Sequence, residues 1–388
     1  MAQQHLDPTD PATARPSPAL DPGRAGGTPG PRPPTGDALA GYLRAQATEF
    51  LRALRLHRET GNGQNGTEDS VDAARALRHS ARRISGSLHT FRPLLDADWS
   101  EEMRPELAWL SGTLALEHAC AARLERLLLA LHRLSGSAAF PAQSAASAVG
   151  GRVTGAGRSV PAPATAAGRG PAVPATATAD RGNLTVGAAK AGALLERQLT
   201  LARTRAHSTA LQALGSSRFH AVADKVAVLA SEVPLTPAAS GADLRPLAAA
   251  AGERLTDAVT ALPLVTAGHP YNAEALIHGL SPDPAPHPQD GPWHQVRLLL
   301  RLHRYAGEVL HGDGAPLDVR LLTAGQALNL HRDASEAAAA AASAARTPRI
   351  APATAYALGV LHADQRHEVE AARFAFQQSW QKQAVGTP

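Results

Sequence analysis

"WHQVRLLLRLHRYAGEVL", residues 293–310, is an apolar stretch in which a basic residue recurs every three or four positions. At about 100° per residue, four basic side chains fall within an arc of roughly 80° on a helical wheel: His294, Arg297, Arg301 and Arg304. The adjoining face is predicted to carry Leu298, Leu299 and Leu302. The stretch therefore predicts an amphipathic helix with a row of basic side chains beside the core.

The same basic spacing occurs earlier in the chain. Residues 75–92, "RALRHSARRISGSLHTFR", align without a gap with residues 294–311. The basic positions coincide in three pairs: Arg75 with His294, Arg78 with Arg297, and Arg82 with Arg301. At the next position Ser85 faces Arg304, and His89 follows on the same arc. We call Arg75, Arg78, Arg82 and His89 the first stripe. His294, Arg297, Arg301 and Arg304 form the second stripe.

Two aligned stripes indicate two pseudo-equivalent halves of a helical bundle that direct basic residues toward a shared space. Like charges at these spacings repel one another by a few tenths of a kcal/mol per pair. A chain that keeps several of them on one partly desolvated face gains only if a multivalent anion binds there. The alternative is a set of solvated surface charges.

Composition favours packed helices over β-sheets. Aromatic residues make up only 4% of the 388 residues, so the core must be built from Leu, Ala and Val. We therefore predict an all-α protein. The net charge of +4 says little about partners. The single cysteine, Cys120, excludes an internal disulfide framework and CxxC-type metal sites.

Pro, Gly and Ala content divides the chain. Residues 1–36 and 137–181 contain too little large apolar surface to order themselves, so we expect a disordered tail and a low-complexity insertion. The helical domain is predicted over 37–384, with a first half at 37–136 and a second half at 182–384. Roughly ten helices are expected, one of which ends at Gly136. No secretory signal and no apolar run of about 20 residues is visible, so we expect a cytoplasmic protein without a membrane partner.

The motifs are similar to those of the conserved histidine α-helical domain family, CHAD. "RALRHSARRIS" followed by "FRPLLDADW" resembles the family's first basic helix, and "HQVRLLLRLHRYAGE" resembles its second. "LNLHRDA" resembles a family turn, and "YALGVLHADQ" with "FQQSW" resembles its closing helices. These features run in order from about residue 37 to 384.

This resemblance implies two pseudo-repeated four-helix bundles with a basic groove or pore between them, which binds inorganic polyphosphate. Some members of the family are fused to a triphosphate-cleaving barrel with an E-x-E-x-K motif. "HEVEAAR", residues 367–373, has two glutamates at that spacing, but we predict a solvated helix face there.

The sequence departs from the family's pattern at several positions. Arg75 stands where the family has its name-giving histidine, and Ser85 where it has an arginine. Leu298 replaces a residue that is often basic, and Asn329 and Leu330 replace a glycine and a glutamate. Losing an arginine removes a forked donor, so these changes predict weaker polyanion binding.

We therefore predict non-catalytic binding of polyphosphate, and of other polyanions, through both stripes. Forked guanidinium donors suit phosphate oxygens. The predicted contact residues are Arg75, Arg78, Arg82, Arg83, His89, His294, Arg297, Arg301, Arg304, His331 and Arg332. Arg83 points about 100° away from the first stripe, and His331 and Arg332 are weaker candidates.

Other functions remain open. The main alternative is a degenerate scaffold or protein-interaction module with weak or no polyphosphate binding. An enzyme ranks third, because the stripe helices offer only Glu308 to hold a divalent metal. We predict no catalytic residue, no metal and no cofactor. Nucleic acid ranks below polyphosphate, because few aromatic residues near the stripes could stack on bases.

Overall fold

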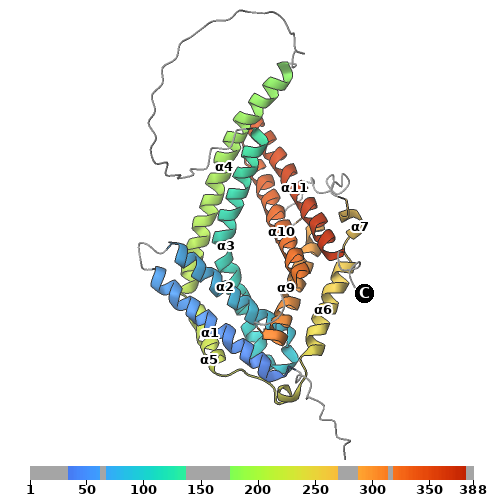
Figure 1. Cartoon of the computed structure of the whole chain (residues 1–388). Helices are drawn as coiled ribbons and strands as arrows, with labels where there is room; N and C mark the ends of the chain where they lie inside the picture. The colour runs from blue at the N-terminus through green and yellow to red at the C-terminus, as the bar shows by residue number, and fades with distance from the viewer. Residues whose placement is uncertain (1–33, 62–66, 137–174, 270–286, 313–317, 382–388) are drawn as a thin grey trace, which may run out of the picture. The chain divides into compact units, whose positions relative to one another are not determined.

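The computed structural model describes residues 34–61, 67–136, 175–269, 287–312 and 318–381 (Figure 1). These residues contain ten α-helices and no β-strand, which confirms the predicted all-α class. The helices are α1 (Gly36–Gly61), α2 (Thr67–Thr90), α3 (Ala97–Ser135), α4 (Ala175–Leu214), α5 (Ser217–Ser231), α6 (Arg245–Thr260), α7 (Leu264–Ala267), α9 (Gly291–His311), α10 (Val319–Ala345) and α11 (Pro352–Gln381). Three short 3-10 helices are η1 (Arg92–Leu94), η2 (Pro237–Gly241) and η3 (Pro288–Asp290).

Local sequence signals explain both ends of α3. At its start the Asp96 side chain accepts a hydrogen bond from the Trp99 backbone N–H at 2.8 Å, which satisfies one of the donors left open by a helix N-terminus. At its end Gly136 has a φ of 65°, a left-handed conformation that glycine adopts without strain. The predicted end of this helix at Gly136 is confirmed.

The predicted tail and insertion lie mostly outside the described residues. At their edges the structure describes residues 34–36 and 175–181. Helix α1 begins at Gly36, and α4 begins at Ala175. Alanines alternate with threonines from Ala175 to Ala179, and alanine has the highest helix propensity. A prediction from composition alone does not include the helix propensity of these alanines.

Buried apolar side chains form three clusters. The first joins α1, α2, α3, α5, α6 and α9 and includes Phe50 and Phe219. The second joins α3, α4, α10 and α11 and includes Leu127 and Leu358. The third joins α6, α9, α10 and α11 around Trp293. Figure 1 shows α3 beside α4 and α10 beside α11, and the two helices of each pair pack against each other. The first cluster takes helices from both sides of residues 137–181.

The two stripe helices, α2 and α9, pack against each other. A Cβ atom at Gly86 would lie 2.7 Å from Cδ2 of Tyr305 and 3.2 Å from Cδ2 of Leu302, so only glycine permits this close approach. Leu302 is buried as predicted, but Leu298 is 43% exposed and does not join the core. The wheel placed both residues on one face, whereas the contact with α2 covers only Leu302.

None of the helices in the described part of the chain carries an apolar stretch long enough to cross a membrane.

Candidate functional site

Four helices line a pocket of about 450 Å³, which we call the basic pocket. Its basic side chains are Arg82 and His89 from α2, Arg104 from α3, Arg301 from α9 and Arg332 from α10. Four of these five residues were predicted from the stripes and the "LNLHRDA" motif. The structure therefore brings parts of both stripes to one cavity, although the two stripes are more than 200 residues apart along the chain.

Arginines that line or adjoin this pocket stand close to one another. Burial, together with the charges of Arg78 and Arg301, lowers the pKa of Arg82 to about 10. Burial, together with the charges of Arg301 and Arg332, lowers the pKa of Arg297 to about 9. All of these groups still carry their charge at pH 7. The shifts result first from burial and second from repulsion by neighbouring arginines.

Stripe arginines differ in whether a carboxylate neutralises them. Within the described ranges, no carboxylate lies within ion-pair distance of Arg78, Arg82, Arg297 or Arg301. Arg297 instead donates a hydrogen bond from Nε to the Asn329 side-chain oxygen at 2.8 Å. We call Arg78, Arg82, Arg297 and Arg301 the unpaired cluster.

The remaining predicted arginines each have an acidic partner. Arg75 pairs with Asp72 at 2.5 Å, and Arg332 donates from Nε to Asp333 at 2.9 Å. Arg83 donates from Nε to Glu308 Oε2 at 2.9 Å, and Arg304 lies 3.5 Å from the other oxygen of Glu308.

The Tyr42 hydroxyl also donates to Glu308, at 2.9 Å. This carboxylate therefore serves as a structural acceptor between α1, α2 and α9. Arg83 points toward it and not toward the basic pocket.

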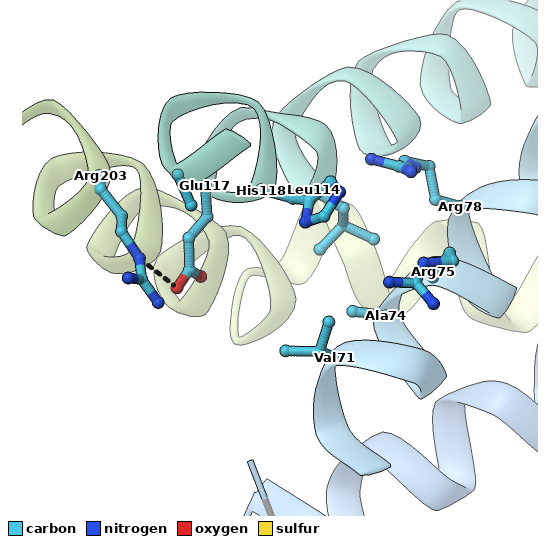
Figure 2. Close-up of a pocket in the computed structure, with 9 residues that line it drawn as sticks. Val71, Ala74, Arg75, Arg78, Leu114, Glu117, His118 and Arg203 are labelled. Atoms are coloured by element: carbon cyan, nitrogen blue, oxygen red, sulfur yellow. Dashed lines mark ion pairs between the residues drawn. The ribbon is translucent and has the colours of Figure 1, made fainter. Parts of the chain in front are cut away.

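The outer end of the first stripe lines a second, smaller pocket of about 100 Å³ (Figure 2). Arg75 and Arg78 reach it from α2, and His118 faces them from α3. At the far side Glu117 pairs with Arg203 at 3.6 Å. Arg78 thus stands between the two pockets, and its Nε has no hydrogen-bond partner in the described residues.

Two basic residues near the cluster were missed in the sequence. Arg104 lines the basic pocket from α3, where it pairs with Glu101 at 3.0 Å. His79 lies on α2 beside the stripe, and partial burial followed by the charges of Arg82 and Arg78 lowers its pKa to about 4. Helical spacing on α2 could have flagged His79, which is one turn from both Arg75 and Arg82. Arg104 belongs to a helix without a stripe, so no local pattern marked it.

The predicted histidines of the second half lie outside the basic pocket. His294 is half-buried, and its Nε2 has no hydrogen-bond partner among the described residues. His331 is only 1% exposed and stacks on Trp293, with ring centroids 5.6 Å apart. Burial lowers the pKa of His331 to about 4, so it is neutral at pH 7. A neutral, enclosed imidazole offers little to a polyanion in solvent.

A buried set of charges surrounds His331, and sequence reasoning did not find it. Asp290 is fully buried and accepts hydrogen bonds from Arg366 Nη1 and Arg373 Nη2, both at 2.7 Å. Arg373 also donates to Glu370 at 2.7 Å. Burial alone would raise the pKa of Asp290, but His331 and Arg366 hold it well below its usual range. We call Asp290, His331, Arg366, Glu370 and Arg373 the Asp290 network.

The network corrects one prediction. Residues 367–373 were expected to form a solvated helix face, and they do lie in a helix, α11. Glu370 and Arg373, however, are only 5% and 4% exposed. Val369 and Phe376 share that face and are buried, so the apolar spacing around the charges was the available signal. No group of three or more His, Cys, Asp or Glu side chains in the described residues has the geometry of a metal site.

Comparisons with known proteins agree with the motifs. Residues 45–342 match the CHAD domain. Among solved structures, the chain is similar to PptA from Streptomyces chartreusis, with 68% sequence identity and a TM-score of 0.69. That similarity covers 90% of this chain and 99% of the other. No protein with a curated description matches the chain.

Proposed function

The chain belongs to the CHAD domain family, and from this premise we propose that it binds inorganic polyphosphate without cleaving it. The ligand would lie across the basic pocket and contact the unpaired cluster. Part of the proposal is that the two stripes face a shared groove between two four-helix halves of the domain. The contact between α2 and α9 supports this arrangement, because these helices come from opposite sides of residues 137–181.

The observation that carries the proposal is the unpaired cluster. Arg78, Arg82, Arg297 and Arg301 are partly buried and lie close to other arginines, so that burial and these neighbouring charges lower their pKa values. They also lack acidic partners in the described residues. Gathering such charges costs stability, and a linear polyanion would repay that cost. Its evenly spaced phosphates can accept from several guanidinium forks at once.

Binding without hydrolysis is supported by the state of Glu308. This residue is the carboxylate on the second stripe helix, and it is engaged by Tyr42, Arg83 and Arg304. A carboxylate held by two cations is a poor ligand for a divalent metal. Phosphoryl transfer generally depends on such metals to neutralise the transferred group.

The test is polyphosphate affinity at two salt concentrations, with single-stranded DNA as competitor. The double variant Arg82→Ala/Arg301→Ala should lose at least about 100-fold in affinity, since each charged contact contributes roughly 1.5–3 kcal/mol. The log–log salt slope should fall by about 1.4, or 0.7 per arginine, if polyphosphate behaves like a single strand.

A matched control removes the same charge elsewhere. Arg52→Ala/Arg55→Ala alters two exposed arginines of α1 that pair with acidic residues of their own helix. This variant should bind polyphosphate nearly as well as the natural protein. Absence of polyphosphate binding by the natural protein, even at low salt, would refute the proposal and leave the scaffold alternative.

A further inference from the structure

The basic pocket has a second wall that carries no charge. Small residues of α3 form it, namely Ala108, Gly112 and Ala115. Ala108 and Gly112 are exposed, and a Cβ atom at Gly112 would meet nothing within 4 Å. The wall is therefore open to an incoming group. A linear phosphate chain has no apolar surface to place against it.

Leu298 extends the uncharged wall from α9. It is 43% exposed, and its neighbours along the stripe are Arg297 and Arg301. Leaving a leucine partly uncovered beside two cations forgoes the stabilisation that full burial of its side chain would give. An apolar ring laid over it would recover part of that energy. The leucine and the arginines suit two different parts of one ligand.

Hydrogen-bonding groups also line the basic pocket, namely Ser85, His89 and Ser111. The two serine hydroxyls donate to the backbone carbonyls of Arg104 and Ala108, so they can accept hydrogen bonds from hydroxyl groups of a ligand. The His89 ring can serve a hydroxyl group or a heterocyclic nitrogen. An acyl chain would leave these groups unused, whereas a ribose and a base would not. The pocket volume of about 450 Å³ is within the usual range for small-molecule sites.

We propose that the basic pocket also binds a nucleoside polyphosphate, with its phosphates on Arg82 and Arg301 and its base against Leu298 and the Gly112 wall. This inference rests on the proposed function, because the same arginines hold the phosphates. It adds a ligand class, because the pocket would distinguish a phosphate chain that carries a nucleoside from a bare phosphate chain.

The experiment compares ATP with inorganic triphosphate and long-chain polyphosphate by isothermal titration calorimetry, without divalent metal and at constant salt. ATP and triphosphate have comparable charge at pH 7, so charge alone predicts similar affinities. We expect ATP to bind roughly ten-fold more tightly, because its base covers apolar surface.

Two variants locate the base. Gly112→Leu fills the open space and should abolish the advantage of ATP while leaving the affinity for triphosphate unchanged within about two-fold. Leu298→Arg should also abolish the advantage, but it should raise the affinity for triphosphate and polyphosphate. The matched control is Gly41→Leu on α1, where a Cβ atom likewise meets nothing within 4 Å. It should change none of the affinities.

The outcomes separate the two proposals. Equal affinity for ATP and triphosphate in the natural protein would overturn the nucleoside inference and leave polyphosphate binding intact. An ATP advantage that survives Gly112→Leu would overturn the assigned wall. If none of the three ligands binds, both proposals fail.

Discussion

The unpaired cluster and the Asp290 network are two groups of partly or fully buried arginines that differ in one respect. In the network, Arg366 and Arg373 each donate to Asp290 at 2.7 Å. In the cluster, Arg82 and Arg301 have no acidic partner in the part of the chain that the structure describes. Paired arginines can be buried because a carboxylate of the protein neutralises their charge. Unpaired arginines remain at a cavity, where a ligand can supply the missing anion.

The difference assigns the two groups to separate roles. Removing one partner of a buried ion pair strands a charge, so the network should matter for folding. Removing one member of a group of like charges relieves repulsion, so the cluster should matter for binding. Each prediction below tests this division.

The largest effect should come from Asp290→Asn. The substitution keeps the shape of the side chain but leaves Arg366 and Arg373 without their shared carboxylate, which should cost about 3–5 kcal/mol in the free energy of unfolding. Arg82→Gln in the cluster should change that free energy by less than about 0.5 kcal/mol. Urea denaturation measures both. Equal losses would show that the cluster is also structural.

The second effect separates Arg82 from its neighbour Arg83. Arg82→Ala should weaken polyphosphate binding by about 1.5–3 kcal/mol, or roughly 10- to 150-fold. Arg83→Ala should weaken it less than about three-fold, because its guanidinium is engaged by Glu308, and should instead lower stability by about 1 kcal/mol. Fluorescence titration with labelled polyphosphate is the readout. Equal losses of affinity would mean that the ligand wraps around α2.

The third effect is a pH dependence of stability. Burial lowers the pKa of His331 to about 4, whereas an unfolded histidine has a pKa near 6.5. Between these values the unfolded chain takes up a proton that the folded chain does not. The free energy of unfolding should therefore be at its full value above about pH 6.5 and should decrease by about 1–2 kcal/mol when the pH is lowered to 5. Burial raises the pKa of Glu370, which opposes this trend at its acidic end.

The pH dependence of stability tests the Asp290 network, and the pH dependence of polyphosphate affinity tests the unpaired cluster. His331→Gln should reduce the dependence of the urea midpoint on pH, and His79, whose pKa is also lowered to about 4, should account for part of the remainder. His79 has a pKa of about 4 beside the cluster arginines, and bound polyphosphate should favour its protonated form. Polyphosphate affinity should consequently rise as the pH falls from 7 to 5, and His79→Asn should remove that rise. If the polyphosphate affinity of the natural protein decreased as the pH was lowered from 7 to 5, the placement of His79 near the ligand would be contradicted.

The smallest effect is expected for Ser85→Arg, which restores a charge at a position that lines the basic pocket. The gain in polyphosphate affinity should be about 1 kcal/mol, because repulsion from Arg82 and Arg104 offsets part of the new contact. The salt slope should steepen by about 0.7. Unchanged affinity and slope in a folded variant would show that residue 85 does not face the ligand.

The stripes could be predicted from sequence because they depend on one helix at a time. A period of 3.6 residues placed Arg82 with Arg78, and Arg301 with Arg297, without knowledge of any other helix. Whether an arginine of a stripe forms an ion pair depends on tertiary contacts. Arg83 meets Glu308 across 225 residues of chain, and no local pattern encodes that contact.

Asp290 shows why the network was missed. It lies within the Pro-rich run "SPDPAPHPQDGP", residues 281–292, whose composition indicates an exposed break between helices. The structure places it in the short helix η3, where Arg366 and Arg373 from α11 enclose it. Burial of a loop residue is decided by the elements that pack over it.

Helix α3 links the two largest apolar clusters by covalent continuity. It has 39 residues and is therefore about 58 Å long. Leu107 and Leu110 near its start belong to the first cluster, and Leu127 and Leu131 near its end belong to the second. Because a helix propagates cooperatively, loss of one cluster weakens the helix that supports the other. Unfolding should accordingly occur in one cooperative transition, and residues 37–136 alone would expose the distal leucines of α3 to water.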